Sequence, residues 1–123
     1  MDKIAKQDLI HAKAKHYVFK SKLRAYLEGS TEVSEAILAD HNACVLGKWI
    51  NEVGKVKYDR YTEIAELDTI HQRIHSTARE IIELKKKGEQ KAIEAKMTTV
   101  NKIGGEIIEK IDELSDRLSE GTI

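Results

Sequence analysis

Three histidines and the only cysteine of this 123-residue chain are the side chains whose types and spacing could bind a metal ion. His71 and His75 are four residues apart, so on a helix their rings leave one face, roughly 6 Å apart at Cβ. Two imidazoles placed in this way can reach one ion at about 2.0–2.1 Å, the usual Zn–N distance. His16 and Cys44 add a third imidazole and a thiolate, which completes a donor set that zinc favours.

Four protein donors would close a tetrahedral shell and leave no position for a substrate. Sites of that kind are structural or regulatory more often than catalytic, so we expect no enzyme activity. The spacing alone leaves a second interpretation open, in which the histidines are core residues of a helical interaction module without a metal. Each buried ring nitrogen without a partner would then cost roughly 1–3 kcal/mol.

The other two histidines are predicted to lie outside the metal site. His11 precedes His16 by five residues, or about 500° around a helix, so its side chain should point to solvent. His41 lies three residues before Cys44, and we expect it either to contact a metal ligand without binding the ion or to cap the loop.

Apolar residues recur every three or four positions over most of the chain, which predicts an all-α fold. His16 and His71 each stand within an apolar stripe of a long helix. Short connections imply antiparallel neighbours, hence a four-helix bundle with a short broken helical segment between the first and third long helices. The first predicted helix carries an apolar stripe from Leu9 to Tyr26 and ends at Glu28-Gly29-Ser30. The segments predicted after it are Glu32–Asp40, Cys44–Asn51, Tyr58–Lys87 and Glu89–Leu118.

Four glycines have predicted structural roles. Gly29 and Gly88 follow the apolar stripes of two helices, where glycine can adopt the left-handed conformation that ends a helix. Gly104 and Gly105 lie within the last predicted helix, where the absence of a side chain permits close approach of a neighbouring helix.

Composition limits the class of protein. With 123 residues, 41% of them hydrophobic and 34% charged, the chain suits a single helical domain over residues 1–123. Its 21 basic residues balance 21 acidic ones, which argues against a nucleic-acid partner. One cysteine cannot form an internal disulfide, and no stretch is apolar enough for a signal peptide or a bilayer span. We therefore expect a cytoplasmic protein without a membrane partner.

Three motifs of the chain together resemble the pattern of the chemoreceptor zinc-binding (CZB) family. They are, in chain order, His16 with Phe19, the stretch Cys44-Val45-Leu46-Gly47-Lys48-Trp49, and His71-Gln72-Arg73-Ile74-His75. The resemblance covers nearly the whole chain. The sequence departs from the family pattern at Phe19, where tryptophan is common, and at Lys15, where an acidic residue often precedes the first histidine.

The resemblance implies a bundle that binds Zn²⁺ through His16, Cys44, His71 and His75 and forms a homodimer. It also implies a sensory or regulatory role in bacterial signalling, such as chemotaxis or cyclic di-GMP synthesis. The output partner would be a chemoreceptor or a diguanylate cyclase. The signal would be zinc availability or a thiol oxidant such as hypochlorous acid.

A haemerythrin-like metal-binding four-helix bundle is the main structural alternative. Di-iron sites of that kind need carboxylates paired with histidines on the same helices. The residues four positions after the five histidines are Lys15, Lys20, Val45, His75 and Arg79, none of them acidic. A catalytic thiol at Cys44 is a further alternative, but no glycine-rich anion loop accompanies it.

Overall fold

A computed structural model describes residues 2–120, so residue 1 and residues 121–123 of the predicted 1–123 domain lie outside the described residues. Helices account for the regular structure, and the described part of the chain contains no strand. The all-α prediction is therefore confirmed. In chain order the elements are α1 (Lys3–Leu27), α2 (Glu35–Ala39), α3 (Val45–Trp49), the π-helix η1 (Ile50–Gly54), α4 (Lys55–Lys57), α5 (Thr62–Lys87) and α6 (Gln90–Glu120).

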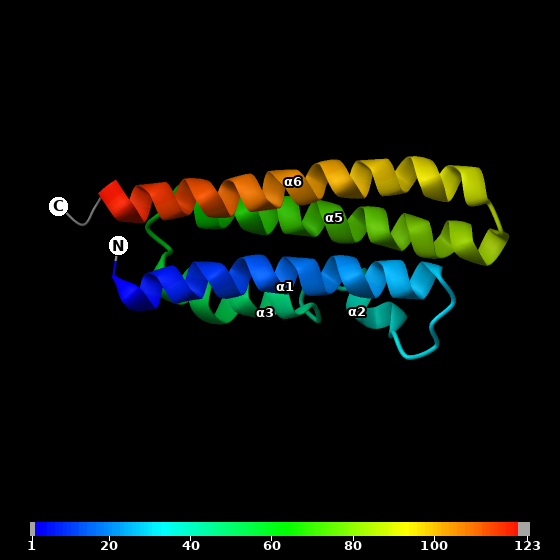
Figure 1. Ribbon diagram of the computed structural model, residues 1–123, viewed down its shortest axis with the longest axis horizontal. Coiled ribbons are helices and arrows are strands. Elements are labelled where there is room, and N and C mark those ends of the chain that lie inside the picture. Colours follow the sequence, from blue (N-terminus) through cyan, green and yellow to red (C-terminus); the bar gives the residue numbers. More distant parts are fainter. Residues whose placement is uncertain (1, 121–123) are drawn as a thin grey trace.

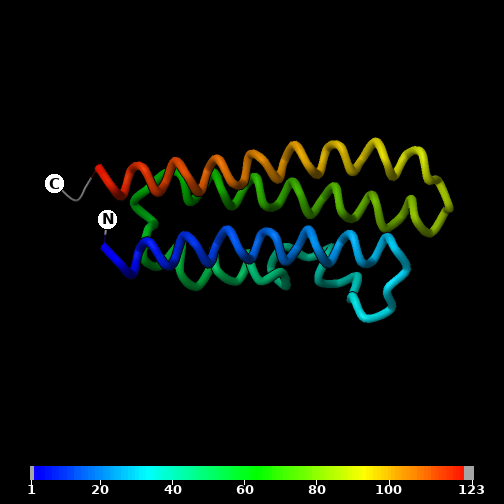
Figure 2. The backbone as a smooth tube through the Cα atoms, in the orientation of Figure 1, coloured from blue at the N-terminus to red at the C-terminus, as the bar shows by residue number. Residues whose placement is uncertain are grey.

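The helices form a bundle in which several short elements replace one long helix. Figure 1 shows α5 and α6 running side by side, with α1 along the bundle below them and with α2 and α3 against α1. The backbone tube in Figure 2 places the start of α1 and the end of α6 at the same end of the bundle. This arrangement confirms the predicted four-helix bundle with a broken segment between long helices.

Both predicted glycine stops are confirmed. Gly29 has φ +101° and follows α1, while Gly88 has φ +72° and follows α5. Both conformations lie in the left-handed region that favours glycine. The N–H group of the residue after each glycine bonds back to the last helical turn, from Ser30 to the Ala25 carbonyl (3.0 Å) and from Glu89 to the Leu84 carbonyl (3.1 Å).

Two predicted boundaries and one predicted length were wrong. Helix α2 begins at Glu35 instead of Glu32, because Ser34 accepts a hydrogen bond from the Ala36 N–H group and so caps it. Helix α5 begins at Thr62 instead of Tyr58, whose hydroxyl donates to the Asp8 carboxylate at 2.7 Å. The helical run after Cys44 continues through η1 and α4 to residue 57, six residues beyond the predicted end.

The apolar stripes form the core, and the predicted metal-binding histidines are part of it. Exposed fractions of His16 and His71 are 1%, and that of His75 is 0%.

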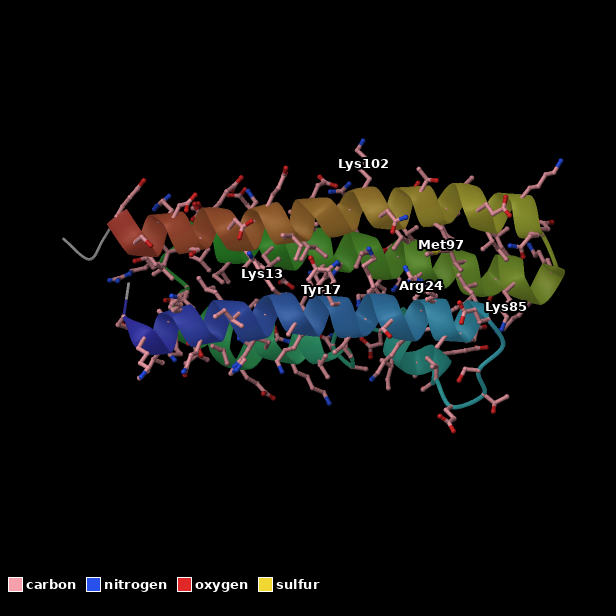
Figure 3. All side chains as sticks on the ribbon, in the orientation of Figure 1. Lys13, Tyr17, Arg24, Lys85, Met97 and Lys102 are labelled. Atoms are coloured by element: carbon pink, nitrogen blue, oxygen red, sulfur yellow. The ribbon has the colours of Figure 1, made fainter. Side chains whose placement is uncertain are left out.

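An ion pair between Lys13 and Asp112 links α1 to α6, and Figure 3 shows Lys13 at the junction of these two helices. Among residues 2–120, no helix is both long enough and apolar enough to cross a membrane.

Candidate metal centre

Helix α5 carries two imidazoles that face each other inside the bundle. The Nε2 atoms of His71 and His75 are 3.1 Å apart, and the ring centroids are 4.6 Å apart. The four-residue spacing produces this pairing, because residues one helical turn apart lie on the same face. Phe19 of α1 packs on the second ring, with its centroid 4.6 Å from that of His75.

Helix α2 fixes the orientation of His75. The Nδ1 atom of this ring lies 2.5 Å from the backbone carbonyl oxygen of Leu38, which is fully buried. Because a carbonyl oxygen only accepts, Nδ1 carries the proton and Nε2 keeps its lone pair toward His71. Arg79, on the next turn of α5, donates to the Ala39 carbonyl at 2.8 Å and so holds the end of α2 in place.

Cys44 lies directly before α3 and brings its thiol to the two imidazoles. Its exposed fraction is 1%, and the ligand atoms of Cys44, His71 and His75 all lie within 4.8 Å of one another. Sequence motifs far apart in the chain therefore supply three donors to one buried point.

Gly47 allows the loop before Cys44 to close against α3. A Cβ atom built on Gly47 would lie 1.7 Å from the His41 carbonyl oxygen and 3.1 Å from Cε1 of His71. The first of these distances is far inside van der Waals contact, so no other residue fits here without movement of the backbone.

The clustered residues fit a zinc ion. Thiolate sulfur and imidazole nitrogen are the usual zinc ligands, and no carboxylate belongs to the group formed by Cys44, His71 and His75 within residues 2–120. The hydrogen bond from His75 to the Leu38 carbonyl is the outer support that metal-binding histidines commonly have, because it fixes the ring and its tautomer. The same donor set does not suit a carboxylate-bridged di-iron site.

His16 is buried near this group but is not part of it. Its Nδ1 atom is buried and has no hydrogen-bond partner, while its Nε2 atom faces α6 at Gly104. The structure therefore brings three of the four predicted ligands together and places the fourth beside α6.

The remaining two histidines lie outside the group formed by Cys44, His71 and His75. His11 is exposed on α1. His41 is half-buried in the loop before Cys44, and its ring meets the edge of the His71 ring at a centroid distance of 6.2 Å. Sequence reasoning missed the Leu38 carbonyl, since a backbone atom leaves no mark in the residue types.

Burial controls the protonation of the candidate ligands. Burial lowers the pKa of His71 to about 3, with a further contribution from the neighbouring His75. It likewise lowers the pKa values of His16 and His75 to about 4. Burial raises the pKa of the Cys44 thiol above its usual value, although the N–H groups of Leu46 and Gly47 oppose part of that rise. The imidazoles are therefore neutral at physiological pH, as metal ligands must be.

These pKa values predict that mild acid destabilises the metal-free protein. Unfolded histidines take up protons near pH 6.5, whereas the buried ones remain neutral down to about pH 4. Between those values the unfolded state binds more protons, so the free energy of unfolding falls as the pH falls, by up to about 1.4 kcal/mol per pH unit for each imidazole. Urea unfolding of chelator-treated protein at pH 7 and pH 5 measures this loss. Equal stability at both values would contradict buried neutral imidazoles, and the exposed-site variant His11→Ala should retain the full dependence.

Comparison with models of protein families matches residues 16–82 to the chemoreceptor zinc-binding domain (CZB). The match begins at His16, includes Cys44, His71 and His75, and covers more than half of the chain. The chain belongs to this family, whose members are regulatory, zinc-binding signalling domains. Comparisons with curated proteins and with solved structures gave no match.

Proposed function

We propose that this protein is a zinc-dependent sensory domain whose ligands are His16, Cys44, His71 and His75. The observation that carries the proposal is the convergence of the Cys44 sulfur with two imidazole nitrogens inside the bundle, all within 4.8 Å. The hydrogen bond from His75 Nδ1 to the Leu38 carbonyl supports the proposal, because it fixes the ring with Nε2 free to bind a metal. A shell of four such donors has no open position, which favours regulation over catalysis.

His16 is the fourth donor in this proposal because of its burial and its unpartnered nitrogen. A buried Nδ1 atom without a hydrogen bond costs free energy, roughly 1–3 kcal/mol for an unmet polar group. Binding to a metal ion is one way to offset that cost. Among the candidate ligands, His71 also has a buried Nδ1 atom without a hydrogen-bond partner. His71 belongs to the group of three donors, so the two rings share this feature.

Cys44 is the residue through which the site would sense its signal. A bound zinc ion supplies the positive charge that keeps the thiol ionised despite burial. Hypochlorous acid would oxidise this thiolate to a sulfenic acid with release of chloride, which removes one donor from the set. Loss of the donor would free the loop before Cys44, which Gly47 allows to close against α3, and this local change in order is the signal a partner reads.

The partners in this proposal follow from exposed surface and from the family. Ile10 and Tyr17 lie seven residues apart on α1 with exposed fractions of 54% and 55%, which makes this face a candidate for association of two copies. The output would be a chemoreceptor or a diguanylate cyclase in the cytoplasm, where an unpaired thiol stays reduced. We also propose that residues 1–123 act as one domain, α6 included.

Elemental analysis of the purified 123-residue chain tests the proposal directly. We expect close to one zinc per chain, retained by the His11→Ala variant and lost by His75→Ala, and a Cys44 thiol that reacts with a chromogenic reagent only after chelation. Iron, or no metal after reconstitution with Zn²⁺, would contradict the proposed function.

Sedimentation of the same sample tests the homodimer, since a species of 13.9 kDa alone would exclude it.

A further inference from the structure

Two adjacent glycines of α6 have different surroundings. A methyl group built on Gly104 would lie 3.0 Å from Nε2 and 3.2 Å from Cε1 of His16. A methyl group built on Gly105 would have no atom within 4 Å. The close approach predicted for both glycines therefore occurs at Gly104 alone, and what approaches it is the ring of a proposed ligand.

We infer that Gly104 is a positioning residue of the metal centre, whose missing side chain lets the His16 ring occupy the place from which it binds zinc. The inference rests on the proposed function, in which His16 is a ligand. It assigns a role to α6, which lies beyond the family match over residues 16–82. No side chain of α6 need touch the ion, since the helix backbone sets the space available to the ring.

The His16 ring has little room to avoid an added methyl group. His16 is itself 1% exposed, and its neighbours on the same face of α1, Ala12 and Phe19, are 0% and 2% exposed, so little open space adjoins the ring. A shift of the ring by a few tenths of an ångström matters, because Zn–N bonds require about 2.0–2.1 Å and a fixed direction.

Helix α6 has equally little freedom to retreat. On its buried face, Val100 and Ile107 flank Gly104 at one turn on either side, and both are fully buried. Lys110 of α6 binds Glu66 of α5 at 2.7 Å, and the Lys13–Asp112 pair joins α6 to α1. We therefore expect a methyl group at Gly104 to displace the ring more than the helix.

The test compares Gly104→Ala with Gly105→Ala in the full chain. Both substitutions raise helix propensity equally, and only the first adds an atom against His16. Competition with a chromophoric chelator should show Zn²⁺ affinity lowered roughly tenfold or more in Gly104→Ala, the effect typical of disturbing a ligand's support, and unchanged in Gly105→Ala. The visible absorption of the Co²⁺-substituted protein should change in the first variant only.

A double substitution separates the inference from the proposed function. In the His16→Ala background, Gly104→Ala should cause no further loss of affinity, because the ring it would displace is gone. A further loss there, or equal affinities of Gly104→Ala and Gly105→Ala in the presence of His16, overturns the inference. If His16→Ala itself leaves Zn²⁺ affinity unchanged, His16 is not a ligand and the proposed ligand set fails instead.

Discussion

Replacement of Cys44 by alanine should lower the Zn²⁺ affinity by roughly a hundredfold or more, since even the outer partners of metal ligands are worth 10- to 100-fold. The thiolate is the one anionic donor in the group with His71 and His75, so its loss removes charge compensation together with one bond. The long helices α1, α5 and α6 have their own apolar contacts, so the metal-free variant should stay helical.

Competition with a chromophoric chelator measures the affinity, and circular dichroism measures the helix content. Val45→Ala is a matched control, because Val45 is the next residue, is half-buried, and has no metal-binding atom. Unchanged Zn²⁺ affinity of Cys44→Ala would exclude Cys44 from the ligand set. Loss of the helical signal would instead mean that the bundle depends on this side chain for folding.

Substitution of Gly47 by alanine should both destabilise the protein and weaken Zn²⁺ binding. The added Cβ atom would lie 1.7 Å from the His41 carbonyl oxygen and 2.9 Å from the carbonyl carbon, so the backbone itself must move. Overpacking typically costs about 1–3 kcal/mol, and backbone contacts of this kind belong at the upper end. The gain in helix propensity on replacing glycine by alanine, about 1 kcal/mol, offsets only part of this cost.

Urea unfolding of the metal-free protein isolates the effect of Gly47→Ala on stability, and chelator competition then gives its effect on the site. Gly105→Ala is the control, since its methyl group has no neighbour within 4 Å and should leave stability equal or higher. A Gly47→Ala variant as stable as the parent would mean that the loop before Cys44 is free to move away from α3.

Periodicity made most of the fold predictable from the sequence. The stripes that contain His16 and His71 repeat at the spacing of an α-helix, and burial of both side chains follows from their place in the stripe. The stops at Gly29 and Gly88 were equally predictable, since few residues other than glycine adopt positive φ without strain. These features depend on local sequence alone.

Tertiary contacts determined the features of the fold and the site that could not be predicted from the sequence. The start of α2 was misplaced because several nearby residues can cap a helix; the structure uses Ser34, and the adjacent Glu35 accepts a hydrogen bond from the Tyr26 hydroxyl at 2.9 Å. The spacing of His71 and His75 predicted their pairing, but the Leu38 carbonyl that orients one ring is a backbone atom. The location of His16 against Gly104 depends on how α1 and α6 pack, which no local pattern encodes.

The π-helix η1 explains a spacing that a regular helix would not tolerate. The residues buried at every fourth position from α3 to the residue after α4 are Leu46, Ile50, Gly54 and Tyr58. On an α-helix each four-residue step overshoots a full rotation by about 40°, so three steps would carry the last residue about 120° away from the first. The wider turns of η1 correct much of this drift. Leu46, two residues after Cys44, and Tyr58, whose hydroxyl donates to Asp8, therefore stay on one side of the helical run.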